Sequence, residues 1–178
     1  MSIDDLAALV RTIPDFPKPG IQFRDNTTLL ADPAGFSELI RRLAGIARPL
    51  DADLVAGIEA RGFILGAALA QALGLGFVPI RKAGKLPGTT VGIDYVLEYG
   101  TDRLEMHEGQ VKQGARVLLV DDLIATGGTA LAAAQLLREQ PAAVLLALFA
   151  IVLPDLGGRS ALEADGIATA ALLEFAGN

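Results

Sequence analysis

The chain has 178 residues, and its 15 Lys and Arg against 21 Asp and Glu give a formal net charge of −6. This charge argues against general nucleic-acid binding, which requires a basic surface that neutralises phosphates. The lack of cysteine and the single histidine exclude disulfides, thiolate zinc sites and multi-histidine metal sites within one chain, so the metal to expect is magnesium held by oxygen ligands and substrate phosphates.

The first thirty residues are expected to form a short helix followed by an arm. Ser2 and Asp5 resemble a capping box, which predicts a helix that runs to about Arg11. The prolines of the segment PDFPKPG cannot continue this helix, so an irregular arm ending in IQFRD is expected. The N-terminus is acidic where a secretory signal would be basic, which predicts a soluble cytoplasmic protein.

The next fifty residues alternate between helical and strand patterns. Asp32 and Pro33 read as the N-cap and first turn of an amphipathic helix that ends near Arg48. After it we expect a strand at LVAG, a turn at EARG, a helix over Phe63 to Leu73 and a strand at FVPIR. Such an alternation indicates parallel strand pairing in an α/β fold.

A glycine-rich basic segment, KAGKLPGTTVG, follows between Lys82 and Gly92 and is expected to be an exposed, mobile loop. Beyond it, Tyr95 to Tyr99 and Arg103 to His107 read as two extended segments around a turn at Gly100. Residues 82–107 are therefore predicted to form a mobile loop and a hairpin flap that borders a cleft.

The last part of the chain predicts two further strands and two helices. We expect strands at Arg116 to Val120 and Val144 to Leu153, and helices at Gly128 to Arg138 and Arg159 to Ala164. The longest apolar run, residues 142–153, is shorter than the roughly 20 residues that a membrane helix requires, so no membrane association is expected. Residues 1–178 are predicted to form a single domain.

The most informative segment is VDDLIATGGT, residues 120–129, which joins an apolar strand to a helix. The N-terminus of a helix offers unpaired N–H groups and a partial positive charge, and paired glycines let the backbone curl around a phosphate. Asp121 and Asp122 lie near the carboxyl end of the strand, where they can accept hydrogen bonds from vicinal hydroxyls. A generic glycine turn is the alternative, but two acids before a threonine-bracketed GG favour a sugar-phosphate site.

The segment DDLIATGGT resembles the phosphoribosyl-pyrophosphate loop of type I phosphoribosyltransferases, in the form found in adenine-using members. FPKPGIQFRD, AGIEARGFILG, IRKAGKLPG and YVLEYG occur in the order and approximate spacing of that family. Ala125 stands where hypoxanthine and guanine relatives have an aspartate. The resemblance implies an open, mostly parallel sheet flanked by helices, an N-terminal hood over about residues 1–30 and a flexible hairpin loop over the cleft.

The resemblance also implies roles for particular residues. Phosphoribosyl and AMP binding fall to Asp121, Asp122, Ala125, Thr126, Gly127, Gly128 and Thr129. Pyrophosphate binding falls to Arg61, Arg81 and Lys85. For Lys82, pyrophosphate binding and simple exposure to solvent remain equally open. Without the resemblance, Arg61 would be read as the partner of Glu59 in an exposed ion pair.

Proton transfer and base recognition are implied in the same way. Glu98 of YVLEYG is implied as the general acid and base, and the single histidine, His107, is expected to be solvated. Adenine would contact the backbone of Gln22 and Arg24 in the hood and the side chain of Leu123.

The implied reaction is displacement of pyrophosphate from phosphoribosyl pyrophosphate by adenine, which gives AMP. Magnesium would arrive with the substrate, with no dedicated protein site, and a homodimer is expected from the resemblance. Two other functions remain open: a ligand-sensing regulator without chemistry, and transfer to another purine or to orotate. A regulator would usually carry a helix-turn-helix or a basic surface, and this acidic chain has no spare residues for the former.

Overall fold

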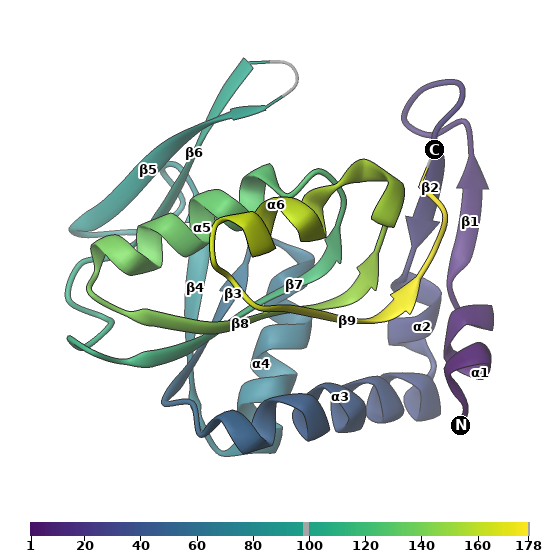
Figure 1. Ribbon diagram of the computed structural model, residues 1–178, viewed down its shortest axis with the longest axis horizontal. Helices are drawn as coiled ribbons and strands as arrows, with labels where there is room; N and C mark the ends of the chain where they lie inside the picture. The colour runs from purple at the N-terminus through teal and green to yellow at the C-terminus, as the bar shows by residue number, and fades with distance from the viewer. Residues whose placement is uncertain (98–99, 178) are drawn as a thin grey trace.

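The computed structural model describes residues 1–97 and 100–177, which form a central sheet, a small two-stranded sheet and helices on both sides (Figure 1). The helices are α1 (Ile3–Ala8), α2 (Thr27–Ala31), α3 (Pro33–Ala47), α4 (Arg61–Leu73), α5 (Gly128–Glu139) and α6 (Gly158–Ala164), with 3-10 turns at Arg48–Leu50 and Pro154–Leu156. The strands are β1 (Arg11–Pro14), β2 (Gln22–Asp25), β3 (Leu54–Ile58), β4 (Gly76–Lys82), β5 (Thr90–Leu97), β6 (Gly100–His107), β7 (Arg116–Ile124), β8 (Ala143–Val152) and β9 (Thr169–Glu174).

The central sheet has the strand order β5-β6-β4-β3-β7-β8-β9. Strands β4, β3, β7, β8 and β9 are parallel, whereas β6 pairs antiparallel with both β4 and β5. After β3 the chain adds strands on the β4 side of the sheet, and from β7 onward it adds them on the other side. A site at the carboxyl ends of the two strands where this order switches, β3 and β7, is typical of open α/β sheets. The predicted α/β fold with a mostly parallel sheet is confirmed.

Helices cover both faces of this sheet, with α5 and α6 above it and α3 and α4 below it in Figure 1. The sequence explains this sandwich: β8 reads AVLLALFAIV, and its last seven residues are all buried, as expected for a strand covered on both faces. One hydrophobic cluster includes Leu136 and Phe149, and the other, toward α3 and α4, includes Leu39 and Leu65.

The N-terminal arm is more ordered than the sequence predicted. α1 begins with the expected Ser2 and Asp5 capping box but ends at Ala8, and the following residues form β1, which pairs antiparallel with β2. The aliphatic and threonine side chains of RTIP suit an extended strand once the helix has ended. We call this small sheet, together with α1 and α2, the hood. Residues 15–21, between its two strands, are irregular as the prolines predicted, whereas the strands at RTIP and QFRD were not predicted.

Several element boundaries also differ from the sequence prediction. β7 continues through Ile124, four residues beyond its predicted end, so Asp121 and Asp122 lie within the strand. The hairpin strands β5 and β6 are longer than predicted, and β5 already begins at Thr90 inside the expected loop. The short helix α2 and the last strand β9 were not predicted.

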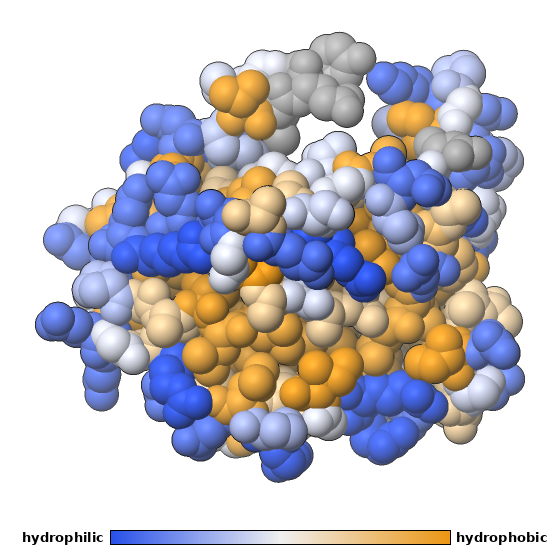
Figure 2. Space-filling model, viewed as in Figure 1, coloured by the Kyte–Doolittle hydropathy of each residue, from blue (hydrophilic) through white to orange (hydrophobic). Residues whose placement is uncertain are grey.

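The hairpin and the hood rise on either side of the carboxyl edge of the sheet (Figure 1). Figure 2 shows the surface hollowed between these two projections, and a hydrophilic band that follows α5 and α6 below the hollow. Within the described residues, no helix is both long and apolar enough to cross a membrane.

Candidate functional site

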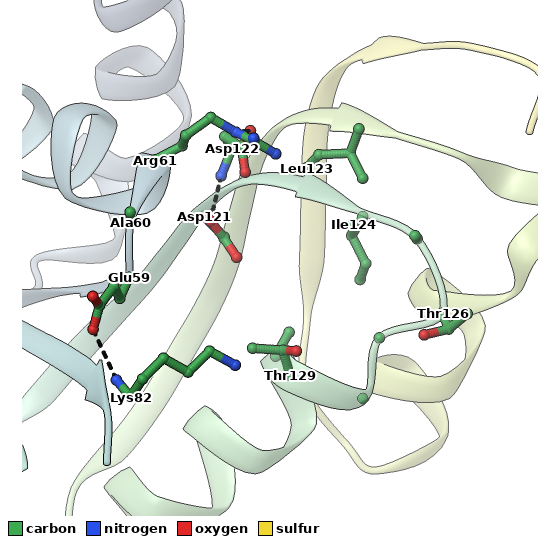
Figure 3. Close-up of a pocket in the computed structure, with 14 residues that line it drawn as sticks. Glu59, Ala60, Arg61, Lys82, Asp121, Asp122, Leu123, Ile124, Thr126 and Thr129 are labelled. Atoms are coloured by element: carbon green, nitrogen blue, oxygen red, sulfur yellow. Dashed lines mark hydrogen bonds and ion pairs between the residues drawn. The ribbon is translucent and has the colours of Figure 1, made fainter. Parts of the chain in front are cut away.

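A cavity of about 360 Å³ lies at the carboxyl edge of the sheet, between β7, β4 and the N-termini of α4 and α5 (Figure 3). The residues that line it are Glu59, Ala60, Arg61, Lys82, Asp121, Asp122, Leu123, Ile124, Ala125, Thr126, Gly127, Gly128, Thr129 and Ala130. The structure therefore brings together all seven residues implied for the phosphoribosyl group, with Arg61 and Leu123 beside them.

The floor of this cavity is the loop between β7 and α5. Gly127 is the N-cap of α5 with φ 87°, a conformation that favours glycine, and no side chain caps the helix. The first N–H groups of this 12-residue helix therefore remain available to an anion.

A second glycine fixes the shape of the loop from outside. The backbone N–H of Gly158, at the start of α6, donates to the carbonyl oxygen of Ala125 at 2.9 Å. A Cβ atom on Gly158 would lie 2.3 Å from that oxygen and 2.7 Å from the backbone nitrogen of Gly127. The loop is thus packed directly against the turn that begins α6.

Asp122 is the better anchored of the two loop carboxylates. It is only 5% exposed, and its Oδ2 atom accepts hydrogen bonds from Asn26 Nδ2 at 2.9 Å and from Arg61 Nε. Burial, with the neighbouring Asp122 charge second, raises the pKa of Asp121 well above its ordinary value. The pair therefore combines one anchored carboxylate with one that is disposed to hold a proton (Figure 3).

Close packing places the start of α4 against these carboxylates. A Cβ atom on Gly62 would lie 2.8 Å from the carbonyl oxygen of Val120 and 2.9 Å from Oδ1 of Asp121. Only glycine leaves room for this approach, since the space beside Gly62 is filled by β7.

Glu59 organises the basic side of the cavity. Its carboxylate accepts from Arg81 Nε at 3.2 Å, from Arg81 Nη2 at 3.1 Å and from the backbone N–H of Lys82 at 2.8 Å. The Arg81 guanidinium holds the pKa of Glu59 below its ordinary value. The exposed Glu59–Arg61 pair that the residues alone favoured is not formed, because Arg61 contacts Asp122 and Glu59 contacts Arg81.

Arg81 and Lys85 lie outside the described lining of the cavity. Arg81 is held by Glu59, stands 5.8 Å from the centre of the Phe63 ring, and donates to the carbonyl oxygen of Lys85 at 3.2 Å. Lys85 is exposed in the loop between β4 and β5. Lys85 therefore lies in the segment that the sequence predicted to be mobile, whereas Arg81 lies in β4 just before it.

Lys82 enters the cavity and points toward Thr129 (Figure 3). Its Nζ atom contacts the Asp102 carboxylate and the hydroxyl of Tyr95 at 2.6 Å, and that hydroxyl lies 3.5 Å from Thr129 Oγ1. Burial lowers the pKa of Lys82, but hydrogen bonds to Asp102 and Tyr95 outweigh it and raise the pKa overall. Lys82 is therefore a fixed cation that links the hairpin to the cavity.

The hood reaches the cavity through its second strand. The Arg61 guanidinium lies 5.8 Å from the centre of the Phe23 ring. Gln22 and Arg24 are outside the described lining: Gln22 is opposite Pro14 in the small sheet, and the Arg24 side chain turns away to donate to the carbonyl oxygen of Ala176 at 3.0 Å. Of the residues implied for adenine, only Leu123 lines the cavity.

Glu98, implied as the general acid and base, lies outside the described residues. Sequence reasoning missed Asn26 and Phe23, which reach the site across the fold, and left Lys82 undecided. The available signal for the first two was the segment IQFRD, which contains Phe23 and directly precedes Asn26. For Lys82 it was membership of the basic cluster that precedes the glycine-rich loop.

The oxygen atoms available in the cavity can be compared with the ligands that the expected magnesium ion requires. Among the described residues no three Asp, Glu or His side chains converge as metal ligands. Asp122 is occupied by Arg61 and Asn26, whereas no described side chain forms an ion pair with Asp121, which feels the Arg61 charge only from a distance. Magnesium is usually bound by one or two carboxylates together with substrate phosphates, and Asp121 could supply one such oxygen.

Comparison with known proteins gives consistent results. A model of the phosphoribosyl transferase domain matches residues 25–161. An adenine phosphoribosyltransferase of Sphingopyxis alaskensis is 62% identical over 174 residues, which cover 98% of this chain and 95% of the relative. The crystal structure of the Thermoanaerobacter pseudethanolicus adenine phosphoribosyltransferase is 45% identical, with a TM-score of 0.93, over 98% of this chain and 100% of that one. The Saccharomyces cerevisiae enzyme, complexed with an imino-altritol bisphosphate and adenine, is 39% identical with a TM-score of 0.89, over 96% and 98%.

Proposed function

The chain belongs to the phosphoribosyltransferase family, among its adenine phosphoribosyltransferases, and from this premise we propose how its cavity carries out the transfer. The reaction joins adenine to the 5-phosphoribosyl group of phosphoribosyl pyrophosphate and releases AMP and pyrophosphate. The observation that carries the proposal is that one cavity holds the uncapped N-terminus of α5, the carboxylates of β7 and two cations, Arg61 at the start of α4 and Lys82 at the end of β4.

The loop of residues 125–129 receives the 5-phosphate. Its backbone N–H groups and the hydroxyls of Thr126 and Thr129 supply donors, and the positive end of α5 favours the anion. Asp121 and Asp122 accept hydrogen bonds from the ribose hydroxyls. Holding the sugar at both ends fixes its anomeric carbon, so that much of the entropic cost of reaction is met on binding.

Pyrophosphate lies on the opposite side, against Arg61 and Lys82. Arg81, at the end of β4, and Lys85, in the loop that follows, add positive charge where the leaving group departs. Magnesium, carried on the substrate phosphates near Asp121, would neutralise further charge on the leaving group. The sugar passes through an oxocarbenium-like state. The negative charge of the departing pyrophosphate and of the carboxylates of β7 stabilises this positive state.

The purine lies toward the hood, between the apolar side chain of Leu123 and β2. Backbone groups of Gln22 and Arg24 read its edge, and Glu98 manages its proton. Glu98→Gln is expected to reduce turnover strongly, by about 100-fold or more, while phosphoribosyl pyrophosphate still binds. Steady-state kinetics and calorimetry would check this, and normal turnover in the variant would remove Glu98 from the mechanism.

The substrate assignment is tested by offering each base in turn. The protein is mixed with magnesium, phosphoribosyl pyrophosphate and adenine, hypoxanthine, guanine or orotate, and pyrophosphate release is measured, with a parallel series in which EDTA replaces magnesium. Pyrophosphate release with adenine, and with none of the other three bases, supports the proposal. Release with another base indicates a different acceptor, whereas binding of phosphoribosyl pyrophosphate without release indicates a regulator. Homodimerisation and cytoplasmic location stay predictions.

A further inference from the structure

The side chain of Asn26 is buried, and its polar contact is with a carboxylate of the candidate site. Asn26 is 2% exposed, and its Nδ2 atom donates to Asp122 Oδ2 at 2.9 Å across 96 positions of sequence. A buried amide is costly unless it is hydrogen-bonded, so this contact accounts for a polar residue at this position.

An asparagine at this position would ordinarily cap the helix that follows it. Asn26 occupies the N-cap position of α2, where asparagine usually accepts a hydrogen bond from the backbone of the first turn, yet its side chain makes no such bond. The preceding residue takes over, because Asp25 Oδ1 accepts from the N–H of Thr27 at 2.9 Å and from its hydroxyl at 2.7 Å. The Asn26 amide is thereby released to reach β7.

The contact constrains one atom of Asp122. Among the described side chains, those of Asn26 and Arg61 both donate to Oδ2, from the hood and from α4 respectively. Two donors on one oxygen fix the plane of the carboxylate and leave the lone pairs of Oδ1 for another partner. Arg61 is itself 44% exposed, whereas Asn26 is enclosed, so Asn26 is the more rigid of the two donors.

We propose that Asn26 is a positioning residue that orients Asp122 toward the ribose, so that the hood sets affinity for the sugar as well as covering the base. The inference rests on the proposed function, since it assigns Asp122 to the ribose hydroxyls. Asn26 touches no substrate and acts through Asp122. Its loss is expected to weaken binding of phosphoribosyl pyrophosphate but not of adenine.

Asn26→Ser gives the sharpest test. Serine is a good N-cap residue, so α2 keeps or gains stability, but its hydroxyl is too short to replace the bond to Asp122. KM for phosphoribosyl pyrophosphate is expected to rise about tenfold, the scale of a lost hydrogen bond to a charged group, while KM for adenine changes less than about twofold. Asn26→Leu, close in size and without a donor, should give the same split.

A matched control separates positioning from general loosening of the hood. Thr28 Oγ1 donates to the carbonyl oxygen of Leu9 at 2.5 Å, so Thr28→Val removes a hydrogen bond of the same helix without touching Asp122. This variant is expected to lower the melting temperature and leave both KM values near those of the parent. Equal KM changes in the Thr28 and Asn26 variants would overturn the proposal.

A double-mutant cycle gives a second criterion. In an Asp122→Asn background, Asn26→Ser should change KM for phosphoribosyl pyrophosphate by much less than tenfold, because its target has already been altered. Full additivity would overturn the proposal even if single variants lose affinity. If the parent transfers phosphoribosyl to adenine and the Asn26 variants match it, only this inference fails; if the parent transfers nothing, the proposed function fails.

Discussion

At the scale of single residues, the contact between Gly62 and β7 allows a direct test of packing. Gly62→Ala would place a methyl group 2.8 Å from the Val120 carbonyl oxygen, an atom that cannot rotate away. We expect a loss of about 1–3 kcal/mol in the free energy of unfolding, together with a fall in activity because Asp121 must move.

Gly45 is the matched control, since it lies within α3 and an added Cβ would meet nothing within 4 Å. Gly45→Ala is expected to stabilise the protein by up to about 1 kcal/mol, because alanine loses less entropy in a helix. Urea unfolding of both variants measures the difference. Equal effects would show that the backbone of α4 can shift away from β7.

Asp25 makes the stability of the hood depend on pH. Hydrogen bonds from Thr27 and Arg11 hold the pKa of Asp25 at about 2, below its ordinary value of 3.8. Because the folded value is the lower one, the stabilisation is fully present above about pH 4 and is lost as the pH falls toward 2. Its size is about 1–2 kcal/mol, discounted because Arg11 is largely exposed.

Acid unfolding of Asp25→Asn checks this expectation. The variant should be less stable than the parent at neutral pH, and the difference should shrink between about pH 4 and pH 2. Asp4→Asn, at an exposed position in α1, serves as the control. A stability gap that stays constant over this range would contradict the prediction.

At the scale of elements, the link between β4, the hairpin and the cavity runs through Lys82. Lys82→Met removes a cation beside the proposed pyrophosphate position, and KM for pyrophosphate in the reverse reaction is expected to rise about tenfold. Asp102→Asn weakens the hairpin contact but keeps the cation, so its effect should be smaller. Lys112→Met, on the exposed surface, is the control, and an equal response there would reject the assignment.

The sequence was informative for elements whose pattern is local. VDDLIATGGT predicted a strand, a glycine turn and a helix in the right order, since the apolar run and the paired glycines are visible in ten letters. It did not predict β9, whose short segment TAALLE has no β-branched run, or α2, which has only five residues. Both are stabilised mainly by tertiary packing.

The residues of the candidate site show the same difference between local patterns and contacts made by distant parts of the chain. Asp121, Asp122 and the residues of the glycine turn are neighbours in sequence, so their common location followed from the motif. Asn26 and Tyr95 reach the site only through pairing of distant elements. Arg81 illustrates the limit: its charge was evident, but its partner Glu59 is 22 positions away, directly after the adjacent strand β3.

At the scale of the whole molecule, the predicted homodimer has a simple measurement. The chain has a mass of 18.5 kDa, so sedimentation equilibrium should give about twice that value. Because association depends on concentration, the measurement is repeated over a hundredfold dilution, with and without AMP. A mass equal to that of one chain at every concentration would reject the dimer.

The contact between Gly158 and Ala125 also matters for protein engineering. A designer who grafts residues 120–129 onto another α/β scaffold transfers the glycines and carboxylates but leaves behind the turn that holds the loop. In the new host, any side chain at the position of Gly158 would strike the Ala125 carbonyl. The smallest transferable unit is therefore a discontinuous one, made of two segments about thirty residues apart.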